Sequence, residues 1–225
     1  MDVRCSDKIF KQLSQNYLKF RNTARYCLGN LDGFDADHLV APQEMEELDR
    51  WAVTRLNALM EKCAKAYNDY EFLVVTHAVN DFCVVDMSNF YLDIIKDRLY
   101  CEKPGSLERR SAQTVLAELF SMLMRDLQPI LSYTVDEAMA YAPAGCVDHQ
   151  KYAALLDWYK SPITFDEANE FEGVLEASLE LRSAVTKALE DARSAGTFTK
   201  SQQVRVKAVV PAEMYALLTG DKAVD

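Results

Sequence analysis

Glycine and proline are scarce in this chain, which contains seven glycines and six prolines among its 225 residues. This is roughly half of their combined share in an average protein, so few of the residues that tight turns require are present. A β-sandwich, a β-barrel or a fold built on glycine-rich nucleotide loops is therefore disfavoured. Because 49% of the residues are hydrophobic, the chain can bury a core and is not expected to be disordered. We expect a mainly α fold, an antiparallel helical bundle.

Apolar residues recur at steps of three and four along most of the sequence, which is the spacing of a helix with one buried face. The first helix is expected to open near Ser6, Ser106 stands where a helix N-cap is expected, and Gly196 stands where a helix should end. The segment 72–101 is apolar almost all round, which is typical of a helix at the centre of a bundle. The predicted helices span residues 6–31, 43–69, 72–101, 107–128, 134–141, 164–194 and 211–218.

One segment, residues 204–210, has the alternating pattern of a β-strand, with valine and alanine separated by Arg205 and Lys207. A single strand leaves its backbone groups unpaired, so we expect partner strands elsewhere in the chain or beyond residue 225. The predicted organisation has three parts. They are a helical bundle (1–145), a linker over the bundle surface (146–163), and a truncated helix–strand–helix region (164–225) that opens with a capping box at Thr164 and Glu167.

The net charge of −10 hides a division of the chain into acidic and basic blocks. Residues 1–31 carry six Lys and Arg against two Asp, whereas residues 35–49 and 166–180 each carry six acids and no base. Further bases follow in residues 182–207. On the first predicted helix the bases lie outside the apolar stripe, so one face is core and the other is basic. Such blocks are ordinarily solvated helix faces, and clustering alone does not identify a nucleic-acid site.

Residues suited to catalysis or metal binding are not grouped in the sequence. The six cysteines include no CxxC pair, so reduced structural thiols are expected rather than a zinc site. No phosphate-binding glycine loop and no G-x-S-x-G elbow is present, and the three histidines are scattered. Asp86, Asp93 and Asp97 share one strip of a predicted helix, which leaves a carboxylate metalloenzyme as one hypothesis. Ion pairs are the alternative, with partners at Lys96, Arg109, Arg110 or Arg125.

The string from Asp86 to Cys101, DMSNFYLDIIKDRLYC, resembles the signature that follows the catalytic domain of bacterial isoleucyl-tRNA synthetases. Other stretches match in the same order, at residues 2–6, 19–25, 28–31, 48–52 and 106–116. The resemblance is strong over residues 1–135 and looser as far as Arg193. The related valyl enzymes share Asn22 and Arg25 but lack the string at 90–97, so the isoleucyl family is favoured and a valyl-type domain is the alternative.

This resemblance implies a helical anticodon-binding domain of a class I synthetase, whose parent enzyme attaches isoleucine to its tRNA using ATP with magnesium. The family's HIGH and KMSKS motifs and its editing domain are missing here, as is the four-cysteine zinc ribbon of many bacterial members. We therefore expect a catalytically inactive fragment with no catalytic residue, cofactor or metal of its own. The expected partner is isoleucine acceptor tRNA rather than DNA or a membrane, and the expected form is a monomer. A cytoplasmic location is expected because no apolar run reaches the roughly 18 residues of a membrane span.

Three groups of residues are candidates for RNA contact, because cations can neutralise phosphates while amides and aromatic rings suit splayed bases. The first group lies on the basic face of the first predicted helix and consists of Lys19, Arg21, Asn22 and Arg25. The second consists of Lys11, Trp51 and Arg55, of which Trp51 also fits a core position. The third lies on the last long helix and consists of Arg182, Lys187 and Arg193.

The rival function is an acidic helical scaffold that binds another protein through an apolar groove. A scaffold of the solenoid type would need a helical repeat. The sequence contains no period of about 30–45 residues, so the scaffold is the less favoured hypothesis.

Overall fold

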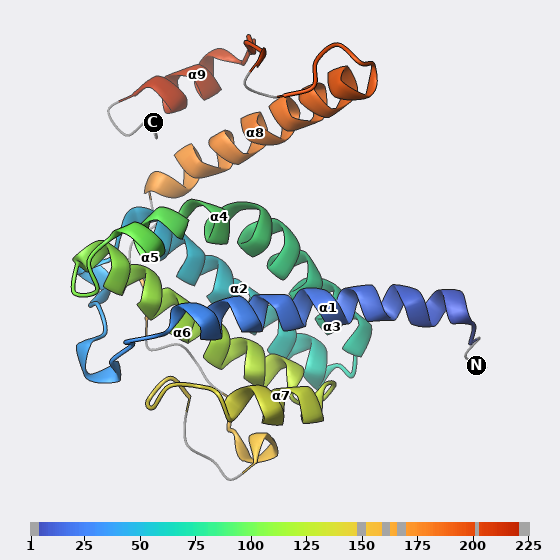
Figure 1. The fold of residues 1–225 in the computed structure, drawn as a ribbon, viewed down its shortest axis with the longest axis vertical. Coiled ribbons are helices and arrows are strands. Elements are labelled where there is room, and N and C mark those ends of the chain that lie inside the picture. Colours follow the sequence, from blue (N-terminus) through green and yellow to red (C-terminus); the bar gives the residue numbers. More distant parts are fainter. Residues whose placement is uncertain (1–4, 148–151, 159–162, 166–169, 201–202, 221–225) are drawn as a thin grey trace. The chain divides into compact units, whose positions relative to one another are not determined.

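The computed structural model describes residues 5–147, 152–158, 163–165, 170–200 and 203–220, and every regular element among them is helical. The mainly α prediction is confirmed. The chain forms two compact units, residues 1–165 and 166–225, each of which is described by itself. The helices of the first unit are α1 (Asp7–Asn30), α2 (Glu47–Asn68), α3 (Phe72–Asp81), η3 (Phe82–Tyr91), α4 (Leu92–Ile94), α5 (Lys96–Cys101), α6 (Leu107–Leu127) and α7 (Ser132–Met139), with short turns η1 (Ala36–His38), η2 (Pro42–Glu44) and η4 (Ala153–Leu155) (Figure 1). The second unit contains α8 (Glu170–Ser194) and α9 (Ala212–Thr219).

Helix α6 is the centre of the bundle, because every residue from Ser111 to Leu127 is buried. Helices α1, α2, α5 and α7 pack against it. Ser106 caps its N-terminus as predicted, accepting a hydrogen bond from the Arg109 N–H at 3.3 Å. The expectation that 72–101 would be the central helix is therefore wrong.

The burial of α6 is not apparent from its hydropathy, because several of its buried residues are polar. Gln113 donates two hydrogen bonds of 3.0 Å, to the carbonyls of Asn30 and Asp32, which fasten the end of α1 to α6. Arg125 donates to the Ser121 hydroxyl within the same helix. Buried polar groups are tolerated when they are bonded in this way, so the central helix need not be the most apolar one.

The segment predicted as one helix at 72–101 is divided into α3, η3, α4 and α5, and η3 is a π-helix. The buried residues Cys83, Met87, Tyr91, Ile95 and Leu99 repeat every four residues. On an α-helix each step of four overshoots a full turn by roughly 40°, so this stripe would drift away from the core. The wider π-helical winding keeps more of the stripe facing inward.

A buried carboxylate joins four of these elements. Asp49 of α2 has no solvent exposure and accepts hydrogen bonds from the Tyr91 hydroxyl at 2.7 Å and the Arg98 guanidinium at 3.1 Å, and also from the Ser111 hydroxyl. Burial raises the pKa of Asp49, although these donors oppose the rise. The cluster fixes α2, η3, α5 and α6 relative to one another.

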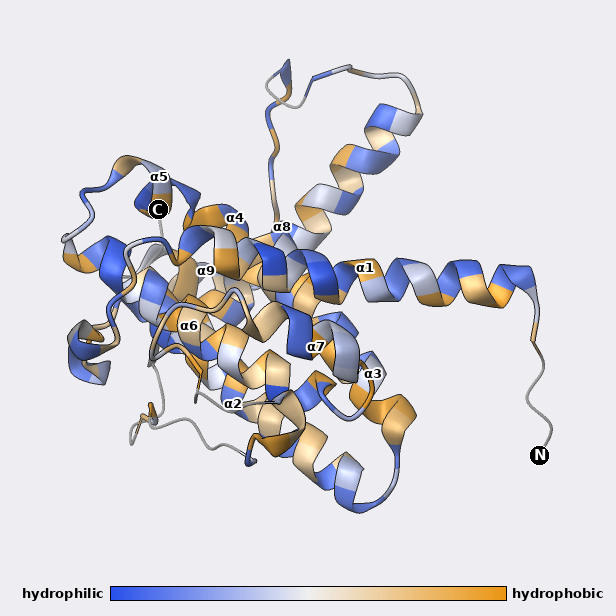
Figure 2. Ribbon diagram, turned by 60° about the horizontal axis from the view of Figure 1, so that its bottom comes forward, coloured by the Kyte–Doolittle hydropathy of each residue, from blue (hydrophilic) through white to orange (hydrophobic). Residues whose placement is uncertain are grey.

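Helix α1 begins where predicted, and the Ser6 hydroxyl caps it by accepting a hydrogen bond from the Ile9 N–H at 3.4 Å. Only its second half is buried, through Phe20, Ala24 and Cys27. The first half extends away from the other helices of the unit, and both views show this projection (Figures 1 and 2). Ile9 and Leu13, which belong to the predicted core stripe, are consequently exposed.

The described part of the predicted linker lies on the bundle, within the first unit. The Ala153 N–H donates to the Asp136 carboxylate at 2.8 Å, and the Arg125 guanidinium donates to the Asp157 carbonyl at 3.1 Å. The ring of Trp158 lies 5.4 Å from that of Tyr67, measured between centroids. The segment therefore covers the bundle with specific contacts.

In the second unit α8 and α9 pack against each other. Gly196 ends α8 as predicted, at a φ of +76°, which favours glycine. The strand predicted at 204–210 is wrong, because no strand occurs among the described residues and Val209 is 91% exposed. An isolated alternating segment has nothing to pair with there. The predicted capping box includes Glu167, which lies outside the described residues.

Candidate nucleic-acid interface

The basic face of α1 is an outcome of how the helix packs. Phe20, Ala24 and Cys27 turn inward, so the polar side chains of the same turns lie on the outer face. Lys19, Arg21, Asn22 and Arg25 are all exposed. Arg21 and Arg25, four residues apart, are neighbours on the helix surface.

None of these four side chains forms an ion pair or hydrogen bond with another residue of the described part of the chain. Adjacent cations without a protein partner repel each other, which is a small cost to the fold that a bound anion would relieve. Arg21, Asn22 and Arg25 thus lie within roughly 100° of one another on one helix, with both charges available, whereas Lys19 is roughly 160° from Arg21 around the same helix.

The groove beside these cations was not apparent from the sequence. It has a volume of about 590 Å³ and runs between α1 and the helices α6 and α7. Its floor is apolar, and its rim is formed by Arg21 and Arg25 on one side and by Glu137 and Tyr141 on the other. No local signal indicates it, because its lining comes from segments that are more than 90 residues apart in the sequence.

The second group of candidates is scattered. Lys11 is exposed on the projecting half of α1. Trp51 is 2% exposed and packs edge-on against Phe90, with ring centroids 5.2 Å apart, so it is a core residue and is not available to stack on a base. Arg55 pairs with Asp86 at 3.2 Å beside a hollow of about 410 Å³ between α2 and α3–η3.

The third group lies in the second unit, where all three side chains are exposed on α8. Arg182 and Arg193 are eleven residues apart and fall within roughly 20° of each other around the helix, whereas Lys187 is roughly 140° away from Arg182. Arg193 also lies over the ring of Phe198, with 5.7 Å between the guanidinium carbon and the ring centroid. These residues therefore do not form one strip.

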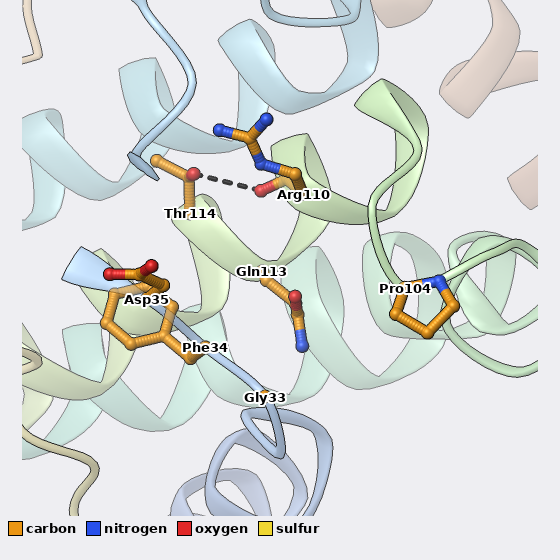
Figure 3. Close-up of a pocket in the computed structure, with 7 residues that line it drawn as sticks. All are labelled: Gly33, Phe34, Asp35, Pro104, Arg110, Gln113 and Thr114. Carbon is orange, nitrogen blue, oxygen red and sulfur yellow. Dashed lines mark hydrogen bonds between the residues drawn. The ribbon is translucent and has the colours of Figure 1, made fainter. Parts of the chain in front are cut away.

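Figure 3 shows a smaller hollow of about 230 Å³, between the loop at Gly33–Asp35 and the first half of α6. The hydroxyl of Thr114 donates to the Arg110 carbonyl at 2.9 Å and accepts from the Val40 N–H at 3.2 Å. Gln113 is bonded to the end of α1, as described above. The polar groups of this hollow hold the loop in place, and we assign it a structural role.

Metal-binding chemistry finds no support in the described residues, among which no three potential ligands are grouped. Asp93 pairs with Lys96 at 2.6 Å, as the ion-pair alternative predicted. The partner of Asp86 is Arg55 rather than one of the arginines expected from the sequence. All six cysteines are free. No helix in the described part of the chain is long and apolar enough to cross a membrane.

The described residues form an all-helical module with a group of exposed, unpaired cations on α1. Residues 49–208 match the family model described as the anticodon-binding domain of tRNA ligase, and the chain belongs to this family. The match begins in α2, so the cationic face of α1 lies outside it.

Similar proteins extend the likeness to nearly the whole chain. It is 42% identical to the isoleucine–tRNA ligase of Syntrophotalea carbinolica over 94% of its length, and 44% identical to that of Carboxydothermus hydrogenoformans over 96%. The isoleucine–tRNA ligase of Klebsiella pneumoniae is 40% identical over 96% of this chain. The aligned part makes up 22–23% of the length of these relatives.

Proposed function

We propose that this chain binds the anticodon stem and loop of isoleucine tRNA, as the anticodon-binding part of an isoleucine–tRNA ligase. The observation that carries the proposal is the set of exposed and unpaired cations on α1. Membership of the anticodon-binding family and the identity to isoleucine–tRNA ligases support it.

The charge distribution favours one face for the RNA. The described part of α1 carries five Lys and Arg against one Asp, although the whole chain has a net charge of −10. At physiological salt, charges more than about 8 Å apart are largely screened, so a phosphate at this face responds to the nearby cations. The acidic remainder repels the RNA from other approaches.

The activity of the longer polypeptide follows as part of the same proposal. The attachment of isoleucine, with ATP and magnesium, is assigned to parts of the ligase outside these 225 residues. Zinc, where such ligases hold it, is assigned there too. The chain by itself is proposed to be a monomer that binds tRNA without catalysing aminoacylation. Sedimentation and an isoleucine-dependent pyrophosphate exchange assay test these two points.

The test of RNA binding is a fluorescence polarisation titration of labelled isoleucine tRNA and of its isolated anticodon stem-loop, at several salt concentrations. The logarithm of the association constant should fall linearly with the logarithm of salt concentration. The double variant Arg21→Gln/Arg25→Gln should make this negative slope shallower by about two. It should also weaken binding roughly 10- to 100-fold at 0.1 M salt.

The matched control is Lys62→Gln/Lys65→Gln, which removes the same charge from exposed positions on α2. It should leave the slope within experimental error of the unchanged chain. Binding that is insensitive to salt, or an equal loss in the control, would refute the assignment to α1. The absence of any binding to isoleucine tRNA would refute the function itself.

A further inference from the structure

The groove beside α1 has the construction of a binding site rather than of a packing defect. Its floor includes Phe20, Met124, Leu127 and Val135, which are all less than 9% exposed and belong to the packed core. The Tyr17 hydroxyl lies 3.3 Å from the Thr134 hydroxyl and joins α1 to α7 beside the groove. The walls are therefore held in place without a ligand.

Its rim has polar side chains on both sides, none of which is paired within the described residues. Arg21 and Arg25 lie along the α1 side, and Glu137 and Tyr141 lie along the α7 side. Tyr141 is 72% exposed, although a tyrosine ring beside an apolar groove would gain by covering it. The rim thus offers two cations, one carboxylate and one aromatic ring to whatever enters.

The volume of about 590 Å³ lies within the range of small-molecule sites, roughly 300–1,000 Å³. A flat ring with apolar faces and a polar edge fits an apolar floor with a polar rim. Two adjacent arginines on one side suit the phosphates that flank such a ring in a nucleic acid. An apolar peptide would use the floor but would leave both arginines desolvated and unpaired, which is costly.

We infer that this groove receives one unpaired nucleobase of the bound RNA, with its flanking phosphates on Arg21 and Arg25 and its ring against Tyr141. The inference rests on the proposed function and adds to it a place for a single-stranded base. Glu137 on the opposite rim can accept a hydrogen bond from an exocyclic amino group. Adenine, guanine and cytosine carry such a group, so they are expected to bind in preference to uracil, whose only donor on that edge is its ring N3–H.

Two variants test the groove while keeping the cations of α1. Ala138→Trp fills it from α7, and Tyr141→Ala removes the proposed stacking ring. Each should weaken binding of the anticodon stem-loop by about 5- to 150-fold, the range expected for the loss of one stacked base. Neither should change binding of the corresponding stem as a closed duplex, which offers no unpaired base. Tyr133→Ala, on α7 and 94% exposed but outside the groove, is the matched control and should have no effect.

The edge of the base is tested with stem-loops in which one loop position at a time is changed to uracil. One position should lose affinity in the unchanged chain, and Glu137→Ala, which removes the acceptor, should reduce that difference, whereas Glu137→Gln keeps an acceptor oxygen and should preserve part of it. Thermal unfolding followed by circular dichroism establishes that each variant is folded.

The outcomes separate this inference from the function on which it rests. If the chain binds the stem-loop with normal salt dependence but the groove variants bind equally well, the groove is not a base site and the function stands. If folded groove variants lose affinity for the stem-loop and the duplex equally, the substitutions act by disturbing the phosphate contacts of the cations, and the inference fails. If the unchanged chain binds neither RNA, the proposed function fails as well.

Discussion

Asp126 provides a test of the buried electrostatics of the bundle. It lies in the central helix α6 with no solvent exposure, and neither of its carboxylate oxygens has a hydrogen-bond partner in the described part of the chain. Burial raises the pKa of Asp126 to about 7, and the nearby Cys63 thiol, which is not at hydrogen-bond geometry, offsets only part of that rise. The residue thus keeps its proton in the folded state up to nearly neutral pH.

The sign of the effect on stability follows from proton binding. Between pH 4 and 7 the unfolded chain releases the Asp126 proton while the folded chain retains it. The folded state then binds more protons, so the free energy of unfolding falls as pH rises through this window and levels off above it. With 1.36 kcal/mol for each pKa unit, the interval from 3.8 to about 7 corresponds to roughly 4 kcal/mol, which is an upper limit because local relaxation relieves part of the penalty.

Asp126→Asn keeps the shape of the side chain and removes its ionisation. Its stability should match that of the unchanged chain near pH 4 and exceed it above pH 7, by up to roughly 4 kcal/mol. The measurement is urea unfolding at pH 4, 5, 6, 7 and 8, followed by tryptophan fluorescence. Both tryptophans, Trp51 and Trp158, belong to the first unit, so the signal reports on the bundle that contains Asp126.

Asp97→Asn is the matched control, because Asp97 is exposed on α5 and has no partner in the described residues. It should not alter the pH dependence. Other buried carboxylates, such as Asp49, also titrate, so the difference between the Asp126 variant and the unchanged chain is the quantity to compare. If the two curves run parallel from pH 4 to 8, Asp126 is not a protonated buried acid and the reasoning is wrong.

Three further outcomes follow from the fold. Asp49→Ala should cost roughly 3–5 kcal/mol in urea unfolding, because it leaves the Arg98 guanidinium and the Tyr91 hydroxyl without their buried partner; a loss below 1 kcal/mol would contradict this role. Trp51→Phe should lower stability but change the affinity for the anticodon stem-loop less than twofold, since Trp51 is a core residue; a large loss of affinity in the folded variant would restore it as a base contact. Dialysis against EDTA should leave the melting temperature unchanged, because no three metal ligands are grouped in the described residues; a drop of several degrees, with zinc found by elemental analysis, would overturn this expectation.

Local signals in the sequence predicted the ends of the helices well. Ser106 caps α6 with its own hydroxyl, and Gly196 adopts a left-handed conformation that other residues avoid. These effects act within one turn of helix, so a short window of sequence contains the whole cause.

Effects that depend on partners far along the chain were not predictable in the same way. The burial of α6 depends on acceptors that lie elsewhere in the chain, namely the Asp49 carboxylate of α2 and the carbonyls of Asn30 and Asp32 at the end of α1, which the sequence of α6 does not contain. The four-residue repeat from Cys83 to Leu99 could have indicated a π-helix, yet it also fits an ordinary apolar helix. The segment at 204–210 has the pattern of a strand, but a strand forms only where another strand pairs with it.

The candidate site falls between these two cases. The basic residues of α1 are read directly from the sequence, and their spacing predicted that they lie outside the apolar stripe. Whether they would be free depended on the neighbours of α1, since an acidic residue on α6 or α7 could have paired with them. The structure places Glu137 across the groove rather than against Arg21 or Arg25, so the cations are exposed, and Phe20, Ala24 and Cys27 anchor the backbone that carries them. That backbone is ordered before binding, whereas Lys11, on the projecting half of α1, has no packed residue beneath it. The core side of α1 therefore decides which of its cations are suited to bind a folded RNA.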